Sequence, residues 1–521
     1  RLHKRAAWLF LFLHRGLFLQ SLFPQRFTIF PQTGIMKVYL FLQSMEGGEA
    51  LAFLDTFLPT QSASRWVSHR ACRLASRLLT IGAAMMLSFL AGGCSRVQTS
   101  IEDLMSPPVL TEEQAQIRDA LARVSGDGEI KYRYPQNGEY RSSYIFYDID
   151  ADGVEEAMVF YQSASKGEAT WINILDQQNG EWVSVCETPA PDSTANIDFV
   201  SFEQLTGDGE ISIVIGWEDL RSSKTAIAYH YQSGRLLPIF EREYTEIAIA
   251  DLDGSGTTDL VLFTPQAQST LVFLACETEN GFETVDSLTL PRSILSFDSV
   301  LTGATSTGSS ALFLDSTVEV YETAFQVTDV ISAQAEEDGT PKLVNLLDNE
   351  LLSLSESTLR PAQNIYCRDI DSDGLIEIPT VSTLPGYEDL LSEDIPFLTT
   401  YNQLLPNEQL SPKQSGVINT QHRYMLRFPQ RWIGQVSAVV QPENGEWTFF
   451  VYNGDLQDTS QTLLRIRVYS AKDYHDKFDG DYFQLIGQKG LFEYYAYVLP
   501  SQSELAITQQ ELTGEMFFFL D

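Results

Sequence analysis

An acidic six-residue pattern that ends in glycine recurs along the middle of the chain and constrains the fold more than any other feature. Three copies have Asp at positions 1 and 3, Asp or Ser at position 5 and Gly at position 6, and they begin at Asp148, Asp251 and Asp369. Two weaker copies begin at Gln204 and Gly303, so successive copies start 56, 47, 52 and 66 residues apart. A motif that recurs at this period indicates a repeat architecture, in which each repeat is one supersecondary unit.

Each of the three strong copies lies between two β-like runs. In the repeat that begins near residue 246 we expect four strands, at Glu246–Ala250, Leu260–Phe263, Thr270–Cys276 and Phe282–Leu288. Apolar and polar residues alternate in these runs, and Gly, Asn, Pro or Asp separates them. Four-stranded antiparallel units of this length are typical of propeller blades. The sequence therefore predicts a mainly β chain, with a β-propeller of about five to six four-stranded blades over residues 139–385.

The spacing of the oxygen-bearing side chains predicts a cation site in each strong copy. Oxygens at positions 1, 3 and 5 converge on one point, glycine at position 6 permits the sharp turn, and a carboxylate at position 9 completes the shell of a hard cation. Without a cation these carboxylates repel one another, so we expect calcium to stabilise each loop. A solvated acidic turn is the alternative for any single copy. The candidate ligands are Asp148, Asp150, Asp152 and Glu156 in the first loop, Asp251, Asp253, Ser255 and Asp259 in the third, and Asp369, Asp371, Asp373 and Glu377 in the fifth.

The two weaker copies lack most of these ligands. The second keeps one carboxylate, Asp208, and has Ser212 at position 9, whereas the fourth keeps none. There we expect turns held by hydrogen bonds of Thr, Ser and Gly rather than metal sites. An EF-hand is a poor alternative for the strong copies because their flanks are β-like and position 12 is Val159, Leu262 or Thr380 instead of Glu.

Over residues 139–385 these segments resemble the FG-GAP and VCBS repeats of integrin-α-like propellers. The resemblance implies calcium in the hairpin loop between the first two strands of a blade, and a mainly architectural role for the metal. The chain departs from the family's pattern in the two loops that lack ligands.

Residues 65–94 have the order of parts that is typical of a bacterial lipoprotein signal peptide. Four arginines precede an uncharged apolar stretch, Leu78 to Leu90, which is short for a membrane span. The segment ends in Leu-Ala-Gly-Gly-Cys94 and resembles a lipobox, where small residues precede a cysteine that becomes lipidated. We therefore expect Cys94 to anchor the protein at the extracytoplasmic face of the membrane. A buried helix that ends in Gly-Gly-Cys is the alternative.

The parts outside the repeats and the signal peptide carry weaker signals. Residues 1–64 begin at Arg1 and are rich in Leu, Phe and Arg; they are either translated from a wrongly placed start or form a membrane-associated leader. Residues 95–138 are expected to form a polar tether and a short amphipathic helix. Residues 386–415 form a linker or complete the last blade, and residues 416–521 are expected to form a smaller α+β C-terminal domain.

The helix expected after the tether has a defined start. Thr111 and Gln114 have the form of a capping box, in which each side chain accepts a hydrogen bond from the other residue's backbone. The apolar residues that follow at helical spacing are Ile117, Ala120, Leu121 and Val124.

The charge distribution argues against one class of partner. The net charge is −36; residues 1–93 carry ten Lys or Arg and three Asp or Glu, which leaves 34 − 10 = 24 basic and 70 − 3 = 67 acidic residues, a net −43. Such acidity repels phosphates, and we expect no nucleic acid partner. It is compatible with cation binding, and it also keeps an exported protein soluble.

The search for catalytic motifs yields little beyond residue 94. His230, His422 and His475 lie in separate segments, and a Ser163-x-x-Lys166 match is near chance frequency. Cys186, Cys276 and Cys367 are widely spaced, match no zinc pattern and are expected to be small buried hydrophobes.

The expected function is therefore that of a non-catalytic lipoprotein, whose calcium-stabilised propeller binds an extracellular protein or glycan. An extracellular carbohydrate-active enzyme with its site on a propeller face is one alternative, and a purely structural lipoprotein is the other.

Overall fold

The computed structural model describes residues 111–520, except 127–128, 168, 192–195, 349–352, 389–394, 408, 442–444 and 471–481. Residues 1–64, the expected signal peptide and Cys94 lie outside this part of the chain. Residues 109–521 form one compact unit. None of the helices described has the length and apolar character that crossing a membrane requires.

The first described element is helix α6 (Glu112–Ser125), which begins where the sequence predicts. The Thr111 hydroxyl accepts a hydrogen bond from the Gln114 backbone N–H, and the Gln114 side chain accepts one from the Thr111 backbone N–H. The predicted capping box is therefore confirmed. The buried side chains of α6, which include Ile117 and Leu121, pack against the sheet that follows.

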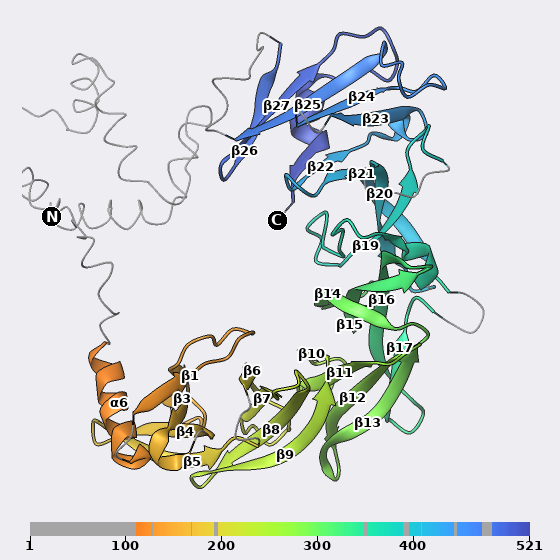
Figure 1. Cartoon of the computed structure of the whole chain (residues 1–521). Helices are drawn as coiled ribbons and strands as arrows, with labels where there is room; N and C mark the ends of the chain where they lie inside the picture. The colour runs from red at the N-terminus through yellow and green to blue at the C-terminus, as the bar shows by residue number, and fades with distance from the viewer. Residues whose placement is uncertain are drawn as a thin grey trace, which may run out of the picture. The chain divides into compact units, whose positions relative to one another are not determined.

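The rest of the described chain folds into six antiparallel sheets that follow one another along the sequence (Figure 1). Sheet 1 comprises β1 (Ile130–Arg133), β2 (Ile145–Tyr147), β3 (Glu156–Ser163), β4 (Thr170–Gln178) and β5 (Glu181–Pro189). Sheet 2 comprises β6 (Asn196–Glu203), β7 (Ser212–Glu218), β8 (Lys224–Gln232) and β9 (Arg235–Tyr244). Sheet 3 comprises β10 (Glu246–Ala250), β11 (Asp259–Pro265), β12 (Thr270–Thr278) and β13 (Gly281–Leu290).

The second half of the described chain continues in the same way. Sheet 4 comprises β14 (Ile294–Ala304), β15 (Ser310–Val320), β16 (Thr323–Ala335), β17 (Pro341–Asn345) and β18 (Arg360–Pro361). Sheet 5 comprises β19 (Ile378–Thr383), β20 (Phe397–Leu404), β21 (Leu410–Asn419), β22 (Tyr424–Arg427) and β28 (Phe517–Phe519). Sheet 6 comprises β23 (Val436–Gln441), β24 (Glu446–Val451), β25 (Thr462–Ser470), β26 (Gln484–Lys489) and β27 (Phe492–Val498). The short helical turns are η1 (Ala164–Lys166), η2 (Ser355–Thr358), η3 (Gln430–Trp432), α8 (Gln509–Glu511) and η5 (Leu512–Met516).

The four strands expected in the third repeat are all present. β10 has the predicted bounds, and β11, β12 and β13 are longer than predicted by one or two residues at an end. Each strand pairs antiparallel with the next along the chain. The prediction of a mainly β chain is confirmed.

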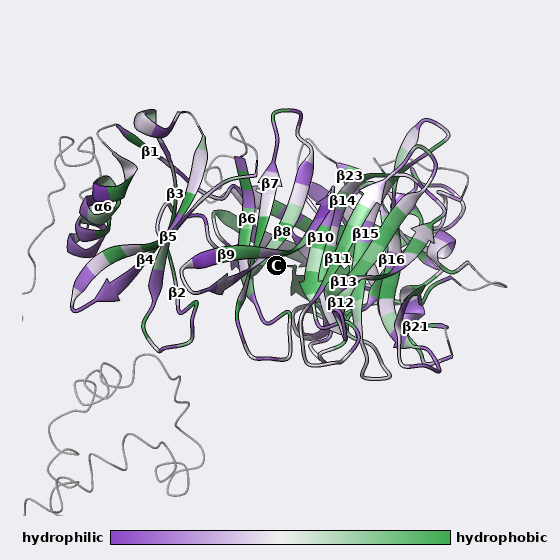
Figure 2. Ribbon diagram, turned by 90° about the horizontal axis from the view of Figure 1, so that it is seen from below, coloured by the Kyte–Doolittle hydropathy of each residue, from purple (hydrophilic) through white to green (hydrophobic). Residues whose placement is uncertain are grey.

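The middle strands of sheets 2 to 5 bury both faces because each of these sheets packs between two others. In β7, Ile213 and Ile215 belong to the apolar cluster shared by sheets 1 and 2, whereas Val214 belongs to the cluster shared by sheets 2 and 3. Successive side chains of a strand point to opposite faces, so an unbroken apolar run fills two interfaces. Further clusters join sheets 3 and 4, sheets 4 and 5, and sheets 5 and 6. Figure 2 shows the hydrophobic stretches along β11, β15 and β16.

The C-terminal part of the chain returns to sheet 5. β28 pairs with β22, with Tyr424 opposite Phe519. The buried Trp432 indole donates a hydrogen bond to the Leu505 carbonyl at 2.7 Å. Sheets 5 and 6 share one apolar cluster. The boundary expected at residue 416 falls inside β21, so residues on both sides of it belong to the same sheet.

A buried ion pair fixes the segment that leads into the fifth loop. Arg360 and Asp315 are both 0% exposed, and Arg360 Nη2 donates to Asp315 Oδ1 at 2.7 Å. Arg360 Nε donates to the Ile365 carbonyl, and the Cys367 backbone N–H donates to the second Asp315 oxygen at 2.6 Å. The charge on Arg360 is thus matched by a carboxylate and a carbonyl, which a buried guanidinium requires. These bonds hold residues 360–367 against sheet 4, directly before the acidic loop that begins at Asp369.

Candidate metal centres

The five copies of the acidic pattern occupy corresponding places in successive sheets. The first four lie in the loops between β2 and β3, β6 and β7, β10 and β11, and β14 and β15 (Figure 1). The fifth lies just before β19, where Arg368 and Glu377 form an isolated antiparallel bridge. Each of the first four loops leads into the strand that is second in the pairing order of its sheet, whereas the fifth leads into the first strand, β19.

The backbone of each strong loop turns through left-handed residues. Glycine at position 6 has φ of 90°, 90° and 87° in the first, third and fifth loops, a conformation that glycine adopts without steric cost. Position 4 also has positive φ in all three loops. The residues concerned are Ala151, Gly153, Gly254, Gly256, Ser372 and Gly374.

The same hydrogen bond closes each of these turns. The position-1 carboxylate accepts the backbone N–H of the position-6 glycine at 3.0 Å in the first loop, 3.0 Å in the third and 2.9 Å in the fifth. The position-5 oxygen accepts the N–H of position 7, at 2.8 Å from Asp152 and 2.9 Å from Asp373. Ser255 makes the equivalent contact at 3.3 Å. The backbone thus directs the side-chain oxygens inward.

The position-9 carboxylate is the most informative group in each loop. Glu156, Asp259 and Glu377 are 1%, 0% and 0% exposed. One oxygen of each accepts the backbone N–H of the residue at position 2, at distances of 2.7, 2.8 and 2.9 Å. The other oxygen is buried and has no hydrogen-bond partner in any of the three loops. A buried ionised oxygen without a partner is costly, so each of these carboxyls needs a proton or a cation.

Burial raises the pKa of the three position-9 carboxyl groups. Desolvation, followed by the charges of nearby acids in the same loop, raises the pKa of Glu156, Asp259 and Glu377 to about 7. The metal-free loops therefore hold carboxyls that exchange protons near neutral pH. A divalent cation would stabilise their ionised form instead.

Several of the predicted ligands lie close together. Ligand oxygens of Asp148, Asp150 and Asp152 lie within 4.8 Å of one another, as do those of Asp369, Asp371 and Glu377. In the third loop Asp253 and Asp259 meet the thiol of Cys276 at the same spacing. The remaining predicted ligands belong to the same loops but lie outside these tight groups. They are Glu156, Asp251, Ser255 and Asp373.

A lysine from β21 reaches the fifth loop. Lys413 Nζ lies 3.3 Å from Asp373 Oδ2 and 4.0 Å from Asp371 Oδ2. Its ammonium group offsets part of the negative charge of that loop. We therefore expect the fifth loop to bind a cation less tightly than the first, to which no such lysine is paired among the described residues.

The weak loops differ from each other. In the fourth, the Thr305 hydroxyl lies 2.7 Å from that of Thr307 and 2.8 Å from that of Ser309, which confirms the predicted hydroxyl-bonded turn. In the second, Asp208 has two further possible ligands near it, Glu210 and His230. Neither residue belongs to the six-residue sequence pattern, and His230 stands opposite Ser212 in the β7–β8 pairing.

The thiol beside the third loop also lies outside the sequence pattern. Cys186, Cys276 and Cys367 are free and buried, as predicted. Desolvation and the charges of Asp259 and Asp253 raise the pKa of Cys276 to about 12. The interpretation of Cys276 as a packing residue alone is incomplete because its sulfur faces two carboxylates.

The Ser163-x-x-Lys166 match takes part in ordinary structural contacts. The Ser163 hydroxyl donates to the Ser125 carbonyl at 3.0 Å, at the end of α6. Lys166 forms an ion pair with Glu187 and a hydrogen bond to Tyr161. These partners hold η1 against sheet 1.

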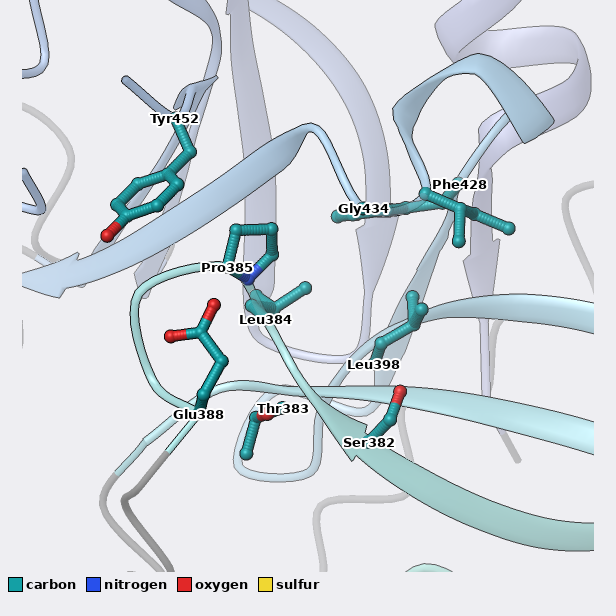
Figure 3. A pocket seen from close by; sticks show the side chains of 10 residues that line it. Ser382, Thr383, Leu384, Pro385, Glu388, Leu398, Phe428, Gly434 and Tyr452 are labelled. Carbon is teal, nitrogen blue, oxygen red and sulfur yellow. The ribbon is translucent and has the colours of Figure 1, made fainter. Parts of the chain in front are cut away.

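A cavity of about 470 Å³ lies where sheets 5 and 6 meet. Figure 3 shows Glu388 and Tyr452 on one side and the apolar side chains of Leu398 and Phe428 on the other. The Gly386 backbone N–H donates to Glu388 at 2.9 Å, and such backbone bonds lower the pKa of this carboxyl. Glu388 is therefore ionised at neutral pH and poorly suited to donate a proton.

No protein-family model matches the sequence, and no curated protein matches it. Among solved structures, a rhamnogalacturonan lyase from Bacillus licheniformis is 12% identical over 62% of this chain and 68% of its own, with a TM-score of 0.25. An exotype rhamnogalacturonan lyase is 11% identical over 65% and 74%, with a TM-score of 0.24. The periplasmic gluconolactonase of Pseudomonas aeruginosa is 11% identical over 65% and 93%, with a TM-score of 0.22. At these TM-scores the similarities carry no argument about this chain.

The metal-free protein should lose stability as the pH rises from about 4 to about 7. Glu156, Asp259 and Glu377 have a folded-state pKa of about 7, above their unfolded value of about 4, so the folded state binds the extra protons. This stabilisation is complete below the unfolded pKa and is lost as the pH rises through the folded pKa. Thermal unfolding of chelator-treated protein at about pH 5 and about pH 8 measures the effect.

The matched control is a variant with Glu156→Gln, Asp259→Asn and Glu377→Gln, in which the difference in melting temperature between the two pH values should shrink. A metal-free wild type whose melting temperature is equal or higher at the alkaline pH would contradict this account of the three carboxyls.

Proposed function

We propose that the protein is a calcium-stabilised β-propeller that serves as a non-catalytic binding or scaffold module on the extracytoplasmic face of a membrane. Each of the six sheets would be one blade, and the strong loops would be the metal sites. One observation carries the proposal: in three equivalent loops a buried carboxylate keeps one oxygen without a hydrogen-bond partner. An isolated acidic turn has no reason to repeat this feature at corresponding places in sheets 1, 3 and 5.

The donor set supports calcium. The first and fifth loops offer carboxylate oxygens alone, with backbone carbonyls alongside. Calcium takes about six to eight oxygens at about 2.3–2.6 Å in flexible geometry, whereas magnesium demands a near-ideal octahedron. Asp150 and Asp152 are exposed while Glu156 is buried, so an ion held between them would face water on one side. Waters on that side would complete its shell.

An architectural role for the ion follows from the position-2 side chains. Ile149 and Leu252 follow the first ligand of their loops and are 3% and 2% exposed. Ile149 packs into the cluster between sheets 1 and 2, and Leu252 into the cluster between sheets 3 and 4. Their backbone N–H groups are the ones that bond the position-9 carboxylate. An ion that orders the loop would thereby fix an apolar anchor between two sheets.

Calcium should stabilise the wild-type protein, by about 2.7 kcal/mol for each loop that it occupies when its free concentration is 100 times the dissociation constant. Glu156→Gln removes the buried charge of the first loop. It should therefore abolish the part of the calcium-dependent stabilisation that this loop contributes. Glu155→Gln is the matched control, because this neighbouring carboxylate is exposed and should not bind the ion. Chemical denaturation with calcium and with chelator measures both. Two results would contradict the metal assignment. One is a wild-type unfolding free energy that does not change with calcium, and the other is an equal loss of calcium-dependent stabilisation in the two variants.

The membrane part of the proposal depends on the lipobox resemblance at Cys94. An acylated Cys94 would tether the acidic body to the membrane surface, where it could present loops to an extracellular protein or glycan. The acidic residues make direct adsorption to anionic lipid unfavourable, so the acyl chains would have to supply the attachment.

Cys94→Ser should release the protein expressed in a bacterial host from the membrane into the soluble fraction, because the acyl acceptor is gone. Detergent phase partitioning with fatty-acid labelling measures this, and Cys186→Ser is the control. Wild-type protein that carries no label, or a Cys94→Ser variant that stays in the detergent phase, would rule out the anchor.

A further inference from the structure

A thiol is directed at the third loop. The Cys276 sulfur and carboxylate oxygens of Asp253 and Asp259 lie within 4.8 Å of one another. Cys276 is 2% exposed, and Asp259 is 0% exposed with its Oδ1 lacking a hydrogen-bond partner. Cys276 is in no disulfide, and no hydrogen bond to its sulfur is present in the described part of the chain. Two buried groups with free ligand atoms therefore face the same point.

Strand pairing explains why the sulfur is there. In the β11–β12 hairpin Leu260 stands opposite Ala275, so the next pair outward is Asp259 and Cys276. Residues directly opposite each other in an antiparallel pair have their side chains on the same face. Cys276 is thus the cross-strand neighbour of the position-9 ligand.

The other strong loops carry oxygen at this cross-strand position. In sheet 1, Ala157 pairs with Leu175. One step further along the register, Asp176 therefore lies beside Glu156. By the same step, Ile378 opposite Asn402 puts Gln403 beside Glu377 in sheet 5. The third loop also has fewer acids, because Ser255 replaces the aspartate of position 5. It is therefore the loop with the weakest oxygen shell and the only strong one with a sulfur neighbour among the described residues.

We infer that the third loop is a mixed oxygen–sulfur site, in which Asp253, Asp259 and Cys276 bind a thiophilic divalent cation of the Zn²⁺ or Cd²⁺ class. Thiolate ligands favour zinc and softer metals, whereas calcium takes oxygen. On binding, the Cys276 S–H bond breaks, the sulfur–metal bond forms and the proton passes to water. The inference rests on the proposed function only in that the loops bind divalent cations.

Cadmium is the probe, because a thiolate bound to Cd²⁺ gives an ultraviolet charge-transfer absorption that calcium and carboxylates do not give. Metal-free, reduced protein titrated with Cd²⁺ should show a saturable band whose final intensity corresponds to one thiolate-bound Cd²⁺ per chain. Cys276→Ser should abolish the band. Cys186→Ser and Cys367→Ser are matched controls, since both thiols are buried outside the metal-ligand groups, and both variants should retain it.

A second variant covers the case in which the buried Cys276→Ser does not fold. Asp253→Asn changes a partly exposed side chain and should keep the band while weakening Cd²⁺ affinity by about tenfold or more. A band that persists in folded Cys276→Ser, or Cd²⁺ affinity unchanged in Asp253→Asn, would overturn the inference.

Calcium titration of the same samples separates the two proposals. Calcium binding without a Cys276-dependent cadmium band would overturn the mixed site and leave the calcium proposal standing. A Cys276-dependent cadmium band in a protein that does not bind calcium would support the mixed site and overturn the calcium proposal.

Discussion

The structure depends on a buried carboxylate that lies at the start of one strand in sheets 1 and 3 and one residue before the first strand in sheet 5. Glu156, Asp259 and Glu377 each use one oxygen to hold the backbone of their own loop and keep the other without a partner. Because an unpaired buried charge is unfavourable, such a carboxylate is tolerated only if something else completes its coordination. A proton can do so at low pH, and a divalent cation can do so at neutral pH.

This local requirement is connected to the packing of the whole chain. The loop that supplies the position-1 to position-5 oxygens also supplies Ile149 or Leu252 to an apolar layer between sheets. Sheets 1 to 5 are covered on both faces by such layers or by α6, so the order of a loop affects contacts between two sheets. If the loops were not ordered, the contacts between these sheets would depend on side-chain packing alone. The proposed ions would therefore stabilise tertiary structure rather than carry out chemistry.

Sequence reasoning was most successful where the determinants are local. The Thr111 capping box, the bounds of β10 and the position of the strong loops depend on residues within a few positions of one another. It was least successful where strand pairing decides the neighbours. Cys276, His230 and Lys413 reach the loops from other strands, and a period of about fifty residues does not reveal the register that brings them there. The return of β28 to sheet 5 is a non-local pairing of the same kind.

Crystals of the protein grown with calcium, with anomalous diffraction data, test the central claim most directly. The account predicts an ion in the first and fifth loops, bonded at about 2.3–2.6 Å to the position-9 oxygen that otherwise has no partner. Well-ordered loops at saturating calcium, with no ion beside Glu156 or Glu377, would contradict it.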